Sequence, residues 1–216
     1  MMTELLAPLY DLNWENLDAV NCTASMVLKK LATDKALLRS KLEGVANDPE
    51  LLSMAEHYDI LDKVVLHNDH ERGFRIRLHV FLPGYFDRPH NHRWTYTSLI
   101  LHGSYRHFMY PPDDNIHDGI DVSELKPVLI REERAGDSYT LHHRMVHSVV
   151  SEPYTVTLIL RGPSTRDRFL VMDRKTNQAW WQYGANNESP EERRVKQMPL
   201  SRLDATIKRL SELGLI

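Results

Sequence analysis

The chain has 216 residues and a formal net charge of -3. Its Lys and Arg residues are scattered among Asp and Glu and form no basic patch, so nucleic acid is not an expected partner. No stretch approaches the roughly 20 apolar residues that a membrane-spanning helix needs, so we expect no membrane association either.

Cysteine usage and the first residues bear on the compartment. Cys22 is the only cysteine and cannot form an internal disulfide. Residues 1–10 contain neither a basic leader nor a long apolar run, so we expect a cytoplasmic protein. Because no Pro- or Ser-rich linker divides the chain, we also expect one domain over residues 1–216.

The first part of the chain has a helical pattern. Between Asn13 and Ala55, apolar residues recur at helical spacing with Asp and Glu interspersed. These apolar residues include Met26, Leu28, Leu31, Leu37, Leu38 and Leu42. We therefore predict a helical N-terminal extension over residues 1–59.

From Ile60 onward the pattern changes to short runs rich in Val, Ile, Leu, Tyr and Thr, separated by turn-forming residues such as Pro83-Gly84 and Gly136-Asp137. The predicted strands are 60–67, 74–82, 94–102, 104–110, 127–132, 145–150, 154–161 and 168–172, followed by a turn and strand within 173–183. So many short strands predict an antiparallel sandwich or barrel over residues 60–184.

Residues 185–216 are expected to form a tail and a short C-terminal helix. Ser201 and Asp204 resemble a capping box that opens this helix, which would run to Leu213 just before Gly214.

The predicted strand at residues 74–82 alternates sharply between two kinds of side chain. One face carries Phe74, Ile76, Leu78, Val80 and Leu82, and the other carries Arg75, Arg77, His79 and Phe81. The apolar face is expected to pack against the helical extension or a partner sheet. The Arg-rich face points either to solvent or into the barrel, and the pattern alone leaves both open.

Three histidines form a candidate metal site. On a β-strand, residues two apart point to the same face, so His90 and His92 can bind one ion while Asn91 faces away. His147 would be the third ligand. Three imidazoles leave coordination positions open for a substrate or small molecule. The alternative is that His90 and His92 cap a strand and that His147 is a half-buried core residue.

The glycines around these histidines carry a family resemblance. Gly84, five residues, His90-Asn-His92 and ten residues to Gly103 are similar to the first motif of the cupins. The segment from Gly136 to His147 resembles the second motif. The resemblance spans Phe74 to Arg161 and implies a mainly β fold, a cupin jelly-roll β-barrel, here with a helical N-terminal extension and a short C-terminal helix.

The sequence departs from the first cupin motif at Tyr96, which stands where cupins usually carry a glutamate ligand. A tyrosine with its ordinary pKa of about 10 is a poor ligand at neutral pH. We therefore expect His90, His92 and His147 without a carboxylate, a set that favours anionic substrates or oxygen species. Within the cupins, three-histidine sites are associated with the thiol dioxygenases and with some diketone-cleaving dioxygenases, so the resemblance implies Fe(II) and dioxygen.

The resulting prediction is an oxidoreductase, a non-haem Fe(II)-dependent dioxygenase acting on a small carboxylate- or amino-acid-like substrate. Tyr96 would tune the site or hydrogen-bond an oxygen species, and His143, which shares the parity of His147, is a candidate for proton transfer, with a turn residue as its alternative. His102 and His107 are expected to be exposed or strand-end residues. Trp94 is expected either to line the pocket or to lie in the barrel core.

Substrate-binding residues are expected on two strands. In similar cupins the strand before the first motif lines the cavity, which favours Arg77 and His79 over Arg75. Arg161 ends a buried strand and either anchors a substrate anion or extends to water. A guanidinium binds a carboxylate in a two-point fork.

Several alternatives remain at this stage. The thiol dioxygenases carry Ser, His and Tyr where this chain has Thr157, Ile159 and Arg161, so cysteine is not the expected substrate. Zn, Ni or Mn at the same ligands would give a non-oxidative lyase, isomerase or hydrolase, and a cupin that only binds a small molecule is a further alternative. Exposed strand edges often pair, which predicts a homodimer.

Overall fold

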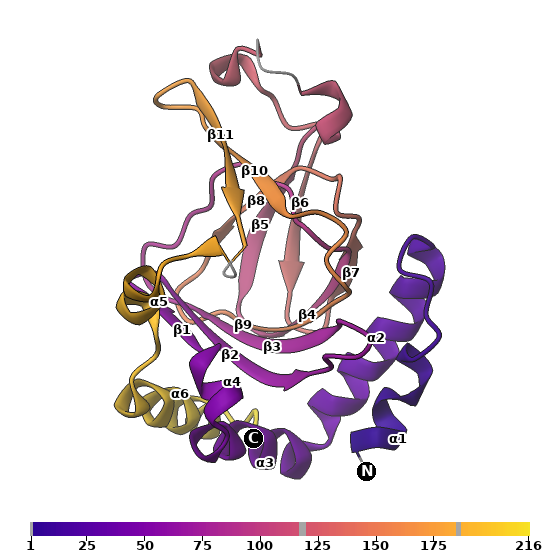
Figure 1. Cartoon of the computed structure of the whole chain (residues 1–216), viewed down its shortest axis with the longest axis vertical. Coiled ribbons are helices and arrows are strands. Elements are labelled where there is room, and N and C mark those ends of the chain that lie inside the picture. Colours follow the sequence, from indigo (N-terminus) through magenta and orange to yellow (C-terminus); the bar gives the residue numbers. More distant parts are fainter. Residues whose placement is uncertain (1, 117–119, 185–186) are drawn as a thin grey trace.

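The computed structural model describes residues 2–116, 120–184 and 187–216. Two antiparallel β-sheets face one another, and helices from both ends of the chain cover the outer face of the larger sheet (Figure 1). The mainly β fold with N-terminal helices and a C-terminal helix is as predicted.

The N-terminal helices begin at polar caps. The elements are α1 (Met2–Leu6), η1 (Ala7–Leu9), α2 (Leu17–Thr33), α3 (Lys35–Gly44), η2 (Val45–Asn47) and α4 (Pro49–Ser53). Asn16, Asp34 and Asp48 each accept a hydrogen bond from a backbone N–H in the first turn of the helix that follows. Asp34 also ends α2, so one residue sets the boundary between two helices.

The larger sheet has the order β1-β2-β3-β9-β4-β7, and all of its strand pairs are antiparallel. Its strands are β1 (Glu56–Tyr58), β2 (Leu61–Asn68), β3 (Arg75–Phe81), β4 (Tyr96–His102), β7 (Ser138–Leu141) and β9 (Val156–Arg161). The sequence did not predict β1 and β7, because strands of three and four residues are too short to show a period.

The second layer combines a three-stranded sheet of order β6-β5-β8 with the hairpin β10-β11. Its strands are β5 (Ser104–Met109), β6 (Leu129–Arg134), β8 (His147–Ser151), β10 (Arg168–Asp173) and β11 (Gln178–Tyr183). His90 forms single β-bridges to His147 and to Val171 and so joins β8 to β10. The short helices η3 (Asp113–Asn115) and η4 (Val122–Glu124) lie in the connection from β5 to β6.

The main core lies between the larger sheet and the helices. Ile76, Leu78 and Val80 of β3 are at most 2% exposed and belong to the same apolar cluster as Leu28 and Leu38 of the helices. Figure 1 shows the helices on the side of this sheet away from β5 and β8. The apolar face predicted for residues 74–82 therefore packs on the helical extension, as expected.

The C-terminal helices are α5 (Pro190–Lys196) and α6 (Leu200–Glu212). The predicted capping box at Ser201 is wrong, because α6 already contains Ser201 and starts after Pro199 without a side-chain cap. A capping box does occur, but at α5, where Ser189 and Glu192 bond to each other's backbone N–H. In the described ranges no helix has the length and apolar character to cross a membrane.

Candidate metal centre

The segment carrying His90 and His92 is extended but is not a regular strand, which corrects the prediction. His90 exchanges two backbone hydrogen bonds with His147, at 2.9 and 2.8 Å, while Asn91 bonds to Leu170 of β10 instead. The preceding Pro89 has no N–H to donate, so only isolated bridges form. Extended backbone still alternates its side chains, and Asn91 points away from the two histidines, as predicted.

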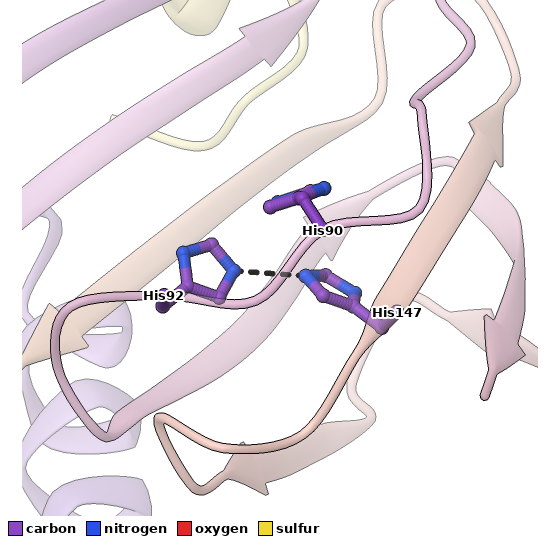
Figure 2. Close-up of side chains that lie close together, drawn as sticks. All are labelled: His90, His92 and His147. Atoms are coloured by element: carbon purple, nitrogen blue, oxygen red, sulfur yellow. Dashed lines mark hydrogen bonds between the residues drawn. The ribbon is translucent and has the colours of Figure 1, made fainter. Parts of the chain in front are cut away.

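The three imidazoles converge on one point (Figure 2). The Nε2 atoms of His92 and His147 are 2.9 Å apart, and one nitrogen of each of the three rings lies within 4.8 Å of the others. An ion bound at about 2.1 Å by two nitrogens at a right angle separates them by about 3.0 Å. The spacing of these donors therefore fits ligands of a single metal ion.

Ring orientation and protonation also suit metal binding. His90 donates its Nδ1–H to the carbonyl of Arg88 at 2.8 Å, which leaves its Nε2 lone pair free. Burial, with a further contribution from the charge of His90, holds the pKa values of His92 and His147 well below the usual range. Both rings are therefore neutral at physiological pH, the form that binds a metal.

Tyr96 lies beside this group rather than within it. Its hydroxyl is 3.3 Å from Nε2 of His147, and its side chain is buried. Burial and the neighbouring Tyr139 and Tyr105 hold the pKa of Tyr96 well above its usual value, so it remains a neutral phenol that can donate a hydrogen bond. Within the described residues, the group of potential ligands at this point consists of His90, His92 and His147.

A cavity of about 500 Å³ is lined by the three histidines and, on another part of its wall, by cationic side chains. The guanidinium carbons of Arg77, Arg93 and Arg161 lie 5.5, 4.9 and 4.8 Å from the ring centre of Trp94. Trp94 itself lines the cavity and also packs, partly buried, against the apolar cluster that contains Tyr96 and Tyr139, so it combines the two alternatives. Three guanidiniums around one indole make this wall attractive to anions.

The cationic wall is not fully paired inside the protein. The Nε atoms of Arg77, Arg93 and Arg161 are buried without a hydrogen-bond partner, although Arg161 donates through Nη1 to the carbonyls of Gly73 and Gly162. Burial, together with Arg77, Arg75 and Arg93, lowers the pKa of Arg161 to about 8. Like charges are therefore held together with free donors, as a site for an anion requires.

The structure places Arg75 outside the cavity wall that contains Arg77 and Arg161. Arg77, His79 and Arg161 all line the cavity, whereas Arg75 bonds to Asn68 at 2.9 Å and is not among the lining residues. The Arg-rich face of β3 thus points inward rather than to solvent. Substrate binding by Arg77, His79 and Arg161 remains a prediction.

Glu56 of β1 supplies negative charge near the cationic wall. Burial alone would raise its pKa, but Lys63, Arg77 and Lys196 outweigh burial and lower it to about 2. Its carboxylate lies 3.4 Å from the Lys63 ammonium and 3.0 Å from that of Lys196. Sequence reasoning missed this residue because β1 is too short to be recognised.

The hairpin β10-β11 forms the rim of the cavity. Phe169 and Val171 of β10 and Trp180 and Tyr183 of β11 line it. Trp180 and Tyr183 are 39% and 44% exposed, so they mark the boundary between the cavity and solvent. In Figure 1 the orange hairpin lies on the opposite side of the larger sheet from α1–α4 and α6.

His143 is not brought to the metal ligands. Its ring lies 3.9 Å from that of His142 and 3.7 Å from the Glu15 carboxylate, and it is absent from the cavity lining. Only its backbone carbonyl reaches the site, where it accepts the N–H of His92. The predicted proton-transfer role of His143 gains no support from this placement.

Glu15, His142 and His143 form a second group of potential ligands. The backbone N–H of Arg144 donates to Nδ1 of His142, so Nε2 of His142 carries a proton and donates to Glu15 at 3.0 Å. The hydrogen bond between His142 and Glu15 therefore connects the loop before β8 to the turn that precedes α2.

The expectation that His107 is exposed or at a strand end is wrong. It lies within β5, is fully buried, and places Nε2 3.0 Å from Nδ1 of His147. The clue in the sequence is parity, since His107 alternates in phase with the apolar Tyr105 and Met109.

No protein-family model and no curated protein matches the sequence. Three solved structures that resemble part of the chain have a TM-score of 0.39 each and cover 52% of it. They are KdgF from a Halomonas species (16% identity, 89% of that chain covered), an RmlC-like cupin from Shewanella frigidimarina (19%, 86%) and the DMSP lyase DddQ from Ruegeria pomeroyi (14%, 52%). At these TM-scores we draw no functional conclusion from them.

Proposed function

We propose that this chain is a metal-dependent cupin-type oxygenase, a mononuclear non-haem Fe(II) dioxygenase that acts on a small carboxylate- or amino-acid-like substrate. The observation that carries the proposal is that three converging histidines and a cationic wall line the same cavity. The histidines His90, His92 and His147 would hold the ion on one side and leave positions facing the cavity. The oxidative step rests on the three-histidine resemblance.

The cationic wall would select and orient the substrate. Arg77 and Arg161 are placed to bind its carboxylate, because their buried Nε–H groups have no partner within the protein. The cavity of about 500 Å³ has room for a small acid together with a second small molecule. Trp94, packed among the arginines, would contact the apolar part of the substrate.

The remaining residues would control protons and water. Tyr96 keeps its proton, and its hydroxyl lies 3.3 Å from Nε2 of His147. It would therefore donate a hydrogen bond to a molecule bound beside this nitrogen. The hairpin residues Phe169, Val171 and Trp180 would exclude bulk water. Ferrous iron at the histidines would supply the activation of dioxygen. Both oxygen atoms go to the substrate in a dioxygenase, so no separate reductant is needed.

The test combines metal analysis with oxygen consumption. Protein produced without added metal is assayed for bound metals by mass spectrometry and for oxygen uptake with a panel of small carboxylic acids and amino acids. We expect iron near one equivalent, and a product 32 mass units heavier than one panel member, as addition of both oxygen atoms requires. In His147→Ala we expect both iron and uptake to be lost. His70→Ala is the matched control, because His70 is exposed and bonds to Glu50.

Other outcomes point to other functions. Zinc, nickel or manganese with conversion of an acid in the absence of oxygen would replace the dioxygenase by a lyase or isomerase. Tight binding of an acid without turnover under air would indicate a binding protein. Full iron content and uptake in His147→Ala would overturn the assignment of the third ligand.

A further inference from the structure

Hydrogen bonds connect His147 to two further buried side chains, His107 and Glu133, on the two neighbouring strands. In the sheet order β6-β5-β8, Glu133 lies on β6, His107 on β5 and His147 on β8. Glu133 is paired with Tyr105 and His147 with Met109, so each is diagonal to His107 and on the same face. The three side chains are 5%, 0% and 4% exposed.

With a single proton on the His107 ring, the hydrogen bonds along this line have only one consistent direction. The Glu133 carboxylate can only accept, so Nδ1–H of His107 donates to its Oε1 at 3.1 Å. Nε2 of His107 then has no proton and accepts Nδ1–H of His147 at 3.0 Å. Arg131 pairs with the same oxygen of Glu133, which keeps this carboxylate as the acceptor at the end of the line.

This direction decides which nitrogen of His147 faces the cavity with a lone pair. With its proton on Nδ1, His147 presents an unprotonated Nε2 toward His92 and Tyr96. If the line ran the other way, Nε2–H of His107 would donate to His147 and the proton of His147 would occupy the nitrogen needed for the metal. Glu133 is the group that forbids the reversed arrangement.

The line also compensates for the missing carboxylate ligand. The three-histidine set brings no negative charge to the ion, and Tyr96 stands in the usual carboxylate position as a neutral phenol. Glu133 supplies a negative charge that acts on His147 through one intervening imidazole. A carboxylate behind a metal-binding histidine orients the ring and makes it a stronger donor.

We propose that His107 and Glu133 are positioning residues of the metal centre, which hold His147 with Nε2 toward the ion and increase its affinity for the metal. The inference rests on the proposed metal site at His90, His92 and His147. We call Glu133, His107 and His147 together the relay. Replacing Glu133 or His107 should weaken metal binding, although neither residue is a metal ligand.

The experiment titrates the full-length protein with Co²⁺ alone, following its visible absorption, and measures affinity by competition with a chelator. His107→Phe removes both hydrogen bonds at similar size, and we expect the dissociation constant to rise 10–100-fold. His107→Gln can still accept from His147 through its oxygen and donate to Glu133 through its nitrogen. We therefore expect it to recover most of the affinity, a rescue that a purely space-filling role would not give.

Controls separate folding, the metal site and the relay. His102→Phe makes the same substitution in β4, the strand that precedes β5 in the chain and belongs to the larger sheet, and is expected to bind Co²⁺ as the unmodified protein does. If His107→Phe does not fold, Glu133→Gln decides. It removes the negative charge and, because an amide can also donate, no longer excludes the reversed direction, so we expect a loss of at least 10-fold. Affinities within twofold of the unmodified protein in the folded variants would overturn the relay. Absence of Co²⁺ binding by the unmodified protein would instead overturn the proposed metal site, and the relay with it.

Discussion

Strand β3 separates two environments within seven residues. On the helix side, Ile76, Leu78 and Val80 are buried in the main core. On the cavity side, Arg77 and His79 each keep a buried nitrogen without a hydrogen-bond partner. The first side gains free energy by burying apolar surface, whereas the second holds unpaired polar groups at a cost to folding. Binding of a ligand would explain why the chain keeps these polar residues at a cost to folding.

Loss of packing on the helix side should have the largest effect. Leu78 is fully buried, and Leu78→Ala is expected to lower the free energy of unfolding by about 3 kcal/mol, within the range of roughly 2–5 kcal/mol for such substitutions. Denaturant unfolding of the metal-free protein measures this change. At saturating Co²⁺ the metal stoichiometry should stay at that of the unmodified protein, since Leu78 faces away from the cavity.

The neighbouring His79→Leu is the matched control on the other face. It replaces an imidazole whose Nε2 has no partner by an apolar side chain, so we expect stability to change by less than about 1 kcal/mol. If His79→Leu destabilises the protein as much as Leu78→Ala, the two faces of β3 contribute equally to the free energy of unfolding, and the contrast between them is wrong.

The second prediction concerns Glu56, which pairs with cations at the cavity edge. Its pKa is lowered to about 2 from an ordinary 4.5, and its side chain is only 19% exposed. At a pH above the pKa of the unfolded state, such a lowered pKa adds on the order of 3 kcal/mol to the free energy of unfolding. This contribution is lost as the pH falls through the folded-state pKa of about 2. Glu56→Gln should therefore lower the free energy of unfolding at pH 7.

The pH dependence is the sharper part of this test. The difference in the free energy of unfolding between the unmodified protein and Glu56→Gln should narrow from pH 5 to pH 3, because the unfolded carboxylate takes up its proton in that window first. Urea unfolding at several pH values measures the difference. A gap that stays constant with pH would mean that Glu56 acts through packing rather than through its charge.

The contrast on β3 also shows what the sequence could predict. Alternation within residues 74–82 identified both faces, because a strand of seven residues is long enough for a period of two. His90 and His92 were paired correctly although they lie outside a strand, since any extended backbone alternates. Glu56 and the relay were missed: the first lies on a strand too short to recognise, and the second depends on strand pairing, which brings Glu133 to His107.

The smallest effect is expected where charge is removed from the cationic wall. Arg77→Met keeps a long side chain but removes a buried cation that repels Arg161, while also removing an attraction to Glu56. Replacing a buried charge by an apolar group is often neutral or stabilising, so we expect the free energy of unfolding to rise by about 1 kcal/mol. Affinity for the carboxylate substrate found in the oxygen-uptake screen should fall at the same time, as isothermal calorimetry would measure. A stability loss above about 2 kcal/mol would instead make Arg77 the structural partner of Glu56, and the cavity side of β3 would then need no ligand to explain it.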